Sequence, residues 1–282
     1  MAEDPRSQAD ALRSQAEALP EAPGVYLFWG RSTTLPLYIG KSIHLRSRVL
    51  SHLRDPDSAR WVAQSLRIEH RRTPGEVGAL LLEAALVKQL QPLHNQRLRR
   101  VRHLHAWRLA DGADGTERPE LVDTTRVDFA TTPHLHGLFA SRHAAQGALR
   151  AMADEHRLCL QRLGMERAWR GSGACFRASI GRCGGVCAGR ETPAAHDARL
   201  RAALAALRLL VWPHPGAVGL VERDETGWQQ VHVLRHWCYL GSADTLDAAR
   251  TLDRSAPGFD MDSYRILSGG LLRDGAELVT LA

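Results

Sequence analysis

The hydrophobic pattern near the N-terminus predicts a pair of antiparallel strands. Residues 25–29 and 35–39 are short runs of apolar, aromatic and β-branched residues, and the turn-rich segment 30–34 between them has the length of a hairpin connection. A paired neighbour then brings Tyr38 alongside Tyr26. Side chains alternate along a strand, which divides the first strand into two faces, with Tyr26 and Phe28 on one and Val25 and Leu27 on the other.

A mixture of apolar and polar positions over residues 43–53 predicts a helix with one polar face. Residues four apart lie on the same side of a helix, so we expect His44, Arg48 and His52 to point the same way. Beside two tyrosines, this row forms a cationic surface that can exchange protons. The alternative is an ordinary solvated helix face, which is the usual role of a run of charges.

A second helix is predicted over residues 77–90, after a Pro-Gly-Glu sequence that ends at Glu76. Its apolar first part carries a single charge, at Glu83. Burying a bare carboxylate is costly, so this side chain must reach solvent, a cation or a partner. One interpretation is that Glu83 shares a solvent face with Glu76. The other is that it holds a hard divalent cation, which carboxylate oxygen suits well.

The rest of the chain predicts short elements without a strong motif. Residues 1–19 form a polar, alanine-rich arm, helical from 5 to 19, that we expect to be dispensable for chemistry. We expect Cys238 to be a buried core thiol, and Asp260 and Asp262 to cap a following helix. The further expected strands are 106–109, 120–123, 135–139, 217–222 and 228–239, with turns at 111–115 and 223–227; the further expected helices are 143–160 and 191–212, the second closed by Pro213 and Pro215.

The length and composition are those of a globular protein. A chain of 282 residues suggests two to three modest domains, and 44% hydrophobic residues are enough for a core. No apolar run approaches the roughly 18 residues needed to span a membrane. The first residues lack the hydrophobic core of a signal peptide, so we expect a cytoplasmic protein.

Positive charge is concentrated in one region. Residues 20–105 contain 14 Lys and Arg against 6 Asp and Glu, a balance of +8, whereas the whole chain carries +6. This region ends in a basic tail next to Asn95. Such a concentration favours contact with a phosphate backbone over a merely soluble surface. The residues expected to bind DNA are Arg46, Arg97, Arg99, Arg100 and Arg102.

Four of the five cysteines, Cys159, Cys175, Cys183 and Cys187, lie within 29 residues. Glycines surround them and let the backbone wrap closely about a centre. In a cytoplasmic chain such a set favours metal binding over disulfides. Zinc is a reasonable metal for these four ligands, although the common Cys-x2-Cys spacing of zinc knuckles is missing.

Several ordered elements resemble the GIY-YIG nuclease domain at matching spacings: Gly24-Val25-Tyr26, Tyr38-Ile39-Gly40-Lys41, Arg48, Glu83 and Asn95. The segment 82–89 and the cysteine loop 180–187 are similar to the excinuclease UvrC type, and the length is closest to its short homologue Cho. The resemblance implies an α+β (α/β) fold: a small nuclease domain with a central antiparallel sheet flanked by helices, then a cysteine-cluster region and a small α+β C-terminal domain. We expect an arm at 1–19, the nuclease at 20–103, the cluster region at 104–212 and the last domain at 213–282.

The resemblance also implies roles for the site residues. Glu83 would hold Mg²⁺ or Mn²⁺, and Arg48 would meet the phosphate with its planar donor fork. Tyr26, Tyr38 or Lys41 would handle the proton of the attacking water, and which one does so stays open. His52 stands where UvrC-type sequences tend to carry tyrosine. Asn95 either orients the site or caps a helix.

The implied function is a metal-dependent DNA endonuclease that cuts one strand 3′ of a lesion in nucleotide excision repair, within the SOS response to DNA damage. Its substrate would be damaged double-stranded DNA presented by UvrA and UvrB, although no clear counterpart of the UvrB-docking element follows the cysteine cluster. For the four cysteines, the resemblance implies a [4Fe–4S] cluster, with Zn²⁺ as the alternative. The alternative functions are another GIY-YIG nuclease, structure-selective or exonuclease-associated, and a non-catalytic, cysteine-cluster DNA-binding adaptor.

Overall fold

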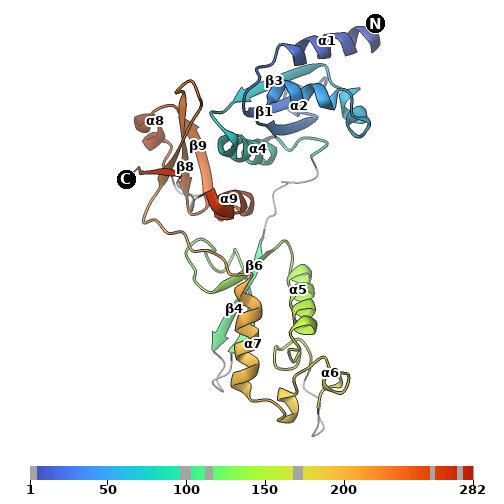
Figure 1. Cartoon of the computed structure of the whole chain (residues 1–282), viewed down its shortest axis with the longest axis vertical. Helices are drawn as coiled ribbons and strands as arrows, with labels where there is room; N and C mark the ends of the chain where they lie inside the picture. Colours follow the sequence, from blue (N-terminus) through green and yellow to red (C-terminus); the bar gives the residue numbers. More distant parts are fainter. Residues whose placement is uncertain are drawn as a thin grey trace. The chain divides into compact units, whose positions relative to one another are not determined.

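A computed structural model gives the fold of the chain, and it describes residues 5–95, 103–111, 117–167, 174–254, 258–271 and 276–281. The chain divides into two compact units, one made of residues 1–100 together with 212–282, and the other of residues 101–211 (Figure 1). The turn expected at 111–115 lies almost wholly outside the described residues. No helix in the described part of the chain has both the length and the apolar character needed to cross a bilayer.

The first unit is built around a three-stranded antiparallel sheet of order β2-β1-β3. Strand β1 pairs with β2 in the register that sets Tyr26 opposite Gly40 and Phe28 opposite Tyr38. The predicted pair of strands is therefore confirmed, but the second strand starts at Tyr38 and not at residue 35. The third strand was missed, because its six residues are mostly polar and exposed. The bounds are β1 Gly24–Trp29, β2 Tyr38–Ser42 and β3 Arg67–Arg72.

Helices cover both faces of this sheet. The face bearing Tyr26 and Phe28 packs against α1, α2 and α3, and the face bearing Val25 and Leu27 packs against α4. The predicted alternation along β1 is thus confirmed, and the sheet is flanked by helices as expected. The N-terminal arm belongs to this core, since Ala16 is fully buried in it. The bounds are α1 Pro5–Glu17, α2 Leu45–His52, η1 Pro56–Ser58, α3 Ala59–Val62 and α4 Glu76–Leu90.

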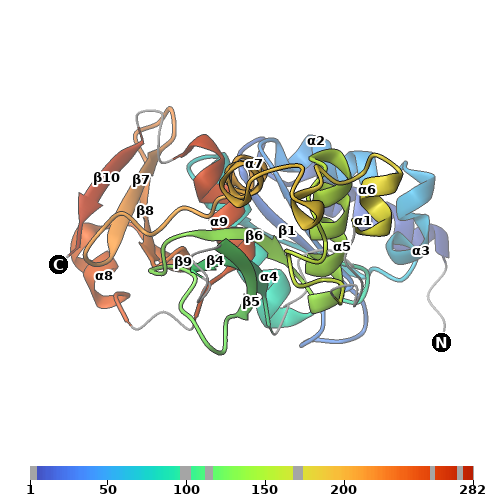
Figure 2. The ribbon, with the colours of Figure 1, turned by 90° about the horizontal axis from the view of Figure 1, so that it is seen from below.

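The C-terminal part of the first unit is a four-stranded antiparallel sheet of order β10-β7-β8-β9 (Figure 2). The expected strand 228–239 is wrong as a single element, because the chain reverses at His236 and Trp237, which both have positive φ angles. Cys238 is buried as predicted. The bounds are β7 Val218–Arg223, β8 Gln229–Arg235, β9 Cys238–Ala243, α8 Leu246–Thr251, α9 Met261–Ile266, η3 Leu267–Leu271 and β10 Glu277–Thr280.

This C-terminal sheet holds the N-terminus of α4. The helix starts after Gly75, which has no side chain to cap it. The carboxylate of Glu222, on β7, accepts the backbone N–H groups of Val77 and Gly78 at 3.0 Å each. Nε2 of His232 donates a hydrogen bond to the same carboxylate at 3.0 Å. Unsatisfied N–H groups and the helix dipole both favour a negative charge at this position, so a distant carboxylate caps α4.

A second set of contacts holds the other end of α4. Asp260 caps α9 as predicted, by accepting the backbone N–H groups of Asp262 and Ser263. Lys88, in the last turn of α4, also lies 2.5 Å from Asp260 and 2.7 Å from Asp262. The C-terminal domain therefore contacts α4 at both of its ends (Figure 1).

The second unit contains a three-stranded antiparallel sheet of order β5-β4-β6 and the helices that pack on it. Helix α5 ends at Glu155, five residues before the expected end, and α7 ends at Ala205 and not at 212. The chain leaves α7 early because Leu209 donates its N–H to Leu135, on β6. The bounds are β4 His105–Asp111, β5 Glu117–Asp123, β6 Leu135–Phe139, α5 Arg142–Glu155, α6 Phe176–Ser179, η2 Val186–Ala188 and α7 Pro193–Ala205.

Candidate active site and metal centre

Two tyrosines and a histidine meet on one face of the sheet β2-β1-β3. The hydroxyl of Tyr26 lies 2.7 Å from Nε2 of His52, and the ring centroids of Tyr26 and Tyr38 are 6.3 Å apart. Gly40 stands opposite Tyr26 in the register, and a Cβ there would lie 2.3 Å from the phenolic oxygen. Glycine is needed at this position because the Tyr26 ring covers it.

Both phenols keep their protons at neutral pH. Burial raises the pKa of Tyr26 far above its ordinary value, and the nearby Tyr38 adds to the effect, although Arg48 opposes it through a hydrogen bond and its charge. Burial also raises the pKa of Tyr38, with a contribution from the charge of Glu83. Neither tyrosine is therefore ionised before the reaction. A phenol that accepts a proton from water must give up its own proton at the same time.

The predicted row of three side chains on the second helix is only partly correct. His44 precedes α2 and is exposed, whereas His52 ends the helix with 6% of its surface exposed. Burial, with help from the charge of Arg48, lowers the pKa of His52 to about 4. His52 is therefore a neutral, buried partner of Tyr26, and the solvated-face interpretation is wrong for it. Arg48 is exposed, beside both phenols.

Glu83 points into the site from α4. It is half-buried, and its Oε1 accepts the backbone N–H of Lys41 at 3.2 Å. Burial raises its pKa, while Lys41 acts in the opposite direction. Glu76 is more exposed and pairs with the ammonium group of Lys41. The two carboxylates therefore do not share one solvent face, and a half-buried carboxylate near two phenols suits a hard divalent cation that also binds a substrate phosphate.

Asn95 ties the segment after α4 to the sheet. Its Oδ1 accepts from the N–H of Ile39 at 2.9 Å, and its Nδ2 donates to the carbonyl of Ile39 at 2.8 Å. The helix C-cap is Gln91, with a φ of 49°, so the capping alternative for Asn95 is wrong. Asn95 therefore fixes β2, the strand that carries Tyr38.

The residues expected to bind DNA are only partly visible. Arg46 is exposed on α2, and its Nε donates to the carbonyl of Leu19 at 2.7 Å. Arg97, Arg99, Arg100 and Arg102 lie outside the described residues.

Three residues around this site escaped the sequence analysis. Trp61 stacks on Tyr38, with ring centroids 4.6 Å apart and planes 9° from parallel. Ser58 lies 2.8 Å from Nδ1 of His52, and the hydroxyl of Ser58 donates to Asp55 at 2.8 Å. A residue six positions after the end of a helix gives no sign in the sequence that it will contact the helix end. No signal in the sequence marked these contacts.

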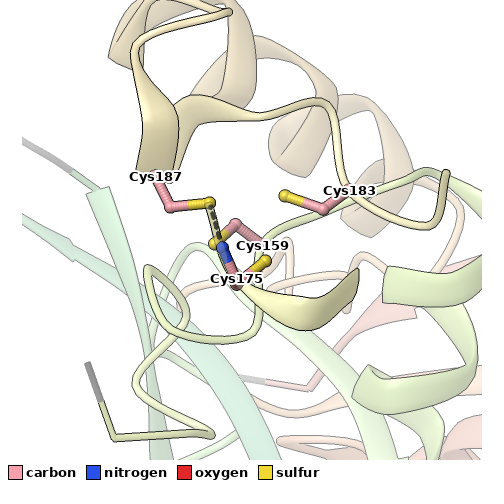
Figure 3. Close-up of side chains that lie close together, drawn as sticks. All are labelled: Cys159, Cys175, Cys183 and Cys187. Carbon is pink, nitrogen blue, oxygen red and sulfur yellow. Dashed lines mark hydrogen bonds between the residues drawn. The ribbon is translucent and has the colours of Figure 1, made fainter. Parts of the chain in front are cut away.

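The four clustered cysteines converge as predicted (Figure 3). Their sulfur atoms lie within 4.8 Å of one another, and all four are free thiols. Tetrahedral Zn²⁺ with Zn–S bonds of about 2.3 Å needs sulfurs about 3.8 Å apart, so this spacing suits a single ion. The cysteines are Cys159, Cys175, Cys183 and Cys187.

Backbone N–H groups also point at the sulfurs. Cys175 donates to Sγ of Cys187, and Gly185 donates to Sγ of Cys183, each at 3.3 Å. Hydrogen bonds of this kind accompany metal-bound thiolates. Burial raises the pKa of Cys159, and it raises that of Cys183 to about 12. Burial acts in the same direction on Cys187, but hydrogen bonds outweigh it and lower the pKa of that thiol. A cation at the centre of the four cysteines would compensate the charge of their thiolates.

A buried polar network, also missed from the sequence, supports this cluster. His196 accepts the backbone N–H of Cys159 at 3.1 Å through its Nε2. Its Nδ1 lies 3.1 Å from Asp197, which receives two hydrogen bonds from Arg162 at 3.0 and 2.8 Å. The network fixes the backbone of the first cysteine of the cluster.

Comparison with known proteins finds matches along most of the chain. Three family models match the chain in sequence: the UvrC-like GIY-YIG domain at residues 22–96, the middle domain of UvrC/Cho excinucleases at 106–206, and the C-terminal domain of excinuclease Cho at 217–282. The chain is therefore a DNA endonuclease of the GIY-YIG class and of the excinuclease type, which acts in nucleotide excision repair.

Individual relatives narrow the assignment. The excinuclease Cho of Escherichia coli (strain K12) is 49% identical over 96% of this chain and 89% of its own length, and that of Salmonella typhimurium is 47% identical over 96% and 90%. The chain belongs to the excinuclease Cho family. The UvrABC system protein C of Haloarcula marismortui is 34% identical over 53% of this chain and 26% of its own length.

Among solved structures, the magnesium-bound N-terminal endonuclease domain of UvrC from Thermotoga maritima is 31% identical. It covers 34% of this chain and 99% of its own, with a TM-score of 0.28.

Proposed function

We propose that this protein hydrolyses one phosphodiester bond 3′ of a lesion in damaged double-stranded DNA, in a reaction that requires Mg²⁺ or Mn²⁺. The observation that carries the proposal is the convergence of two phenols, one guanidinium and one half-buried carboxylate at one end of the nuclease sheet. Phosphodiester hydrolysis needs a base for the water and positive charge for the phosphorus centre. These four groups, Tyr26, Tyr38, Arg48 and Glu83, supply them.

Each residue has a distinct task. The side chain of Arg48 is exposed beside the phenols, where its planar fork binds a phosphate oxygen of the scissile bond. A divalent cation held by Glu83 would act as a Lewis acid on the phosphate and the leaving 3′ oxygen. The proton of the attacking water goes to Tyr38 or Tyr26. Lys41 does not take it, because its ammonium group is paired with Glu76.

The remaining site residues position these groups. His52 accepts the hydrogen bond of Tyr26, and the side chain of Asn95 holds the strand of Tyr38. Arg46 and the four arginines of the basic tail bind the DNA backbone: Arg97, Arg99, Arg100 and Arg102. These contacts are electrostatic, so binding weakens as the salt concentration rises.

The four clustered cysteines hold a structural metal centre, either a [4Fe–4S] cluster or Zn²⁺. The sulfur spacing suits one zinc ion, whereas the family resemblance of the cysteine loop favours iron and sulfide. Hydrolysis needs no electron, so the centre fixes the fold of residues 104–212. Iron and zinc analysis after anaerobic purification, with absorbance at about 400 nm, distinguishes the two.

We also propose that UvrA and UvrB present the damaged DNA to this protein. We further propose these domain bounds: an arm at 1–19, the nuclease domain at 20–103, the cysteine-cluster region at 104–212 and a C-terminal domain at 213–282. The C-terminal domain supports helix α4 through the contacts described above.

The test is cleavage of a duplex with one defined lesion, in the presence of Mg²⁺ and with or without UvrA and UvrB. Glu83→Gln and Arg48→Ala each abolish nicking while DNA binding persists. The matched control is Glu69→Gln, at a partly exposed glutamate on β3 that pairs with Arg67, and we expect it to keep full activity. Mapping the nick to the 3′ side of the lesion, and its loss without the two partners, support the pathway.

Other outcomes overturn the proposal. If Glu83→Gln cuts as fast as Glu69→Gln, the metal-binding role of Glu83 is wrong. If the wild-type protein binds the duplex but never cuts it under any divalent cation, the protein is a DNA-binding adaptor. Cutting of undamaged branched DNA without partners indicates a structure-selective nuclease.

A further inference from the structure

A continuous chain of hydrogen bonds leads from the active site to the surface. It starts at the hydroxyl of Tyr26, which lies 2.7 Å from Nε2 of His52. It continues from Nδ1 of His52 to Oγ of Ser58 at 2.8 Å, and from Ser58 to the carboxylate of Asp55 at 2.8 Å. His52 and Ser58 are buried, whereas Asp55 is partly exposed.

The chemistry of its members fixes the direction of every bond. An ionised carboxylate has no proton to donate, so Ser58 donates its single hydroxyl hydrogen to Asp55. Ser58 must then accept from His52, which places the imidazole proton on Nδ1. A neutral imidazole has only one N–H, so its Nε2 is an acceptor, and Tyr26 is the donor. Every bond therefore donates outward, from the phenol to the carboxylate.

The charges around His52 agree with this arrangement. The neutral side chains of Tyr26, Tyr38 and Trp61 face the ring, together with Phe28. The charged groups that act on it are Arg48 and Asp55, and burial with the charge of Arg48 lowers the pKa of His52 to about 4. The ring is neutral at physiological pH, as the outward direction requires. Glu83 is not a member of this hydrogen-bonded series in the described residues, because its recorded hydrogen bond comes from the backbone N–H of Lys41.

A buried phenol that acts as a base needs a route by which its own proton can leave. Burial keeps Tyr26 protonated, so it cannot take a proton from water, directly or through Tyr38, unless its own proton leaves at the same time. The ring of Tyr38 lies beside that of Tyr26, with centroids 6.3 Å apart. The exit route therefore begins at Tyr26.

We propose that Ser58 and Asp55 complete a proton relay, in which they set the tautomer of His52 and carry the proton of the attacking water from Tyr26 to the surface. The proposal rests on the nuclease function argued above and deepens it. Ser58 and Asp55 touch no reacting atom, so both are positioning residues.

The proton transfers balance. As water gives a proton to the Tyr26 oxygen, the phenolic proton moves to Nε2 of His52, the Nδ1 proton moves to Ser58, and the Ser58 proton moves to Asp55. Four O–H or N–H bonds break and four form. The negative charge of the carboxylate is transferred to the new hydroxide, and Asp55, at the surface, then releases its proton to solvent.

The first test compares single-turnover cleavage by Ser58→Ala, Asp55→Asn and Asp57→Asn on the damaged duplex. We expect the first two to lose roughly 10- to 100-fold in rate, because a positioned base contributes about 10²- to 10⁴-fold and part of the route survives. Asp57 is exposed on the same turn and is the matched control. In a His52→Gln background, Ser58→Ala should cause no further loss, because residues that act as a unit are not additive.

The pH dependence separates a relay from a packing role. Solvent hydroxide takes over the proton at high pH, so the deficit of Ser58→Ala should shrink as the pH rises. A packing role lowers the rate by the same factor at every pH, and that result would overturn the proposal. Nitrogen-15 spectra of the histidines should show His52 protonated on Nδ1 in the wild type and on a mixture of the two nitrogens in Ser58→Ala. A wild-type ring protonated on Nε2 also overturns it.

Failure of the relay and failure of the nuclease assignment are distinguishable. If Glu83→Gln and Arg48→Ala abolish cleavage while Ser58→Ala behaves like Asp57→Asn, the nuclease function stands and the relay is wrong. If the wild-type protein binds the duplex but never cuts it under any divalent cation, both are wrong. Thermal unfolding of each variant checks that a lost rate does not come from a lost fold.

Discussion

Replacing Glu222 by alanine should loosen the helix that carries Glu83. The Glu222 carboxylate is only 15% exposed and accepts two backbone N–H groups at the start of α4. It also pairs with His232, whose side chain is fully buried. The glycines of this turn permit the approach, since a Cβ on Gly75 would lie 2.2 Å from Oε1 of Glu222. The alanine variant therefore leaves three polar groups without their partner.

The magnitude of the effect follows from these three contacts. Losing a helix cap costs about 0.5–2 kcal/mol, and losing a negative charge at the helix N-terminus costs a further 0.3–1 kcal/mol or so. A buried imidazole nitrogen left without a partner costs about 1–3 kcal/mol. Because the three terms overlap, we expect a total destabilisation of about 2–4 kcal/mol.

Amide hydrogen exchange over residues 76–82 is the direct assay. A local loss of about 2 kcal/mol speeds exchange roughly 30-fold, since each 1.4 kcal/mol is a factor of ten. Glu225→Ala, an exposed glutamate on the neighbouring turn, is the matched control and should leave exchange unchanged. Unchanged protection of Val77 and Gly78 in Glu222→Ala would show that the distant carboxylate does not cap this helix.

Three further predictions test the fold and the site. Gly40→Ala places a Cβ against the hydroxyl of Tyr26, so we expect cleavage to fall by at least about 10²-fold while circular dichroism stays unchanged. Asp197→Ala removes the carboxylate that pairs with the half-buried Arg162; we expect the free energy of unfolding of this unit to fall by about 3–5 kcal/mol, and metal analysis to show a depleted cysteine centre. For Glu222, burial raises the pKa, but hydrogen bonds from His232, Gly78 and Val77 outweigh it and lower the pKa below 4.5. A depressed folded pKa gives stability that is present above the unfolded pKa and is lost as the pH falls through the folded one. The advantage of wild type over Glu222→Gln in denaturant titrations should therefore be full near neutral pH and disappear on acidification; an advantage that grows on acidification would contradict the sign.

The sequence predicted the elements whose signal is local. The alternation of Tyr26 and Val25 on β1 requires only the period of a strand, and the single charge of Glu83 in an apolar helix stands out by itself. The clustering of the four cysteines and the capping role of Asp260 were also readable from short segments. All of these depend on residues that are near each other in the chain.

The features that sequence reasoning missed depend on contacts between distant or weakly patterned segments. Strand β3 is mostly exposed and polar, so it shows no alternation, yet it pairs with β1 along its whole length. His52 looked like a solvated residue because its burial comes from Trp61 and Tyr26, on other elements. The cap of α4 by Glu222 joins residues 144 positions apart, so no local sequence pattern predicts it.

This cap has a consequence for protein synthesis. The N-terminus of α4 leaves the ribosome long before the glutamate that binds it, and at about 5–20 residues per second the delay is roughly 7–30 s. During that interval the first turn of the helix is hydrated, and the nascent nuclease domain lacks the support of its last strands. A newly made chain therefore completes the cap of α4 only after the cysteine-cluster region has emerged, which sets the order in which the two candidate sites mature.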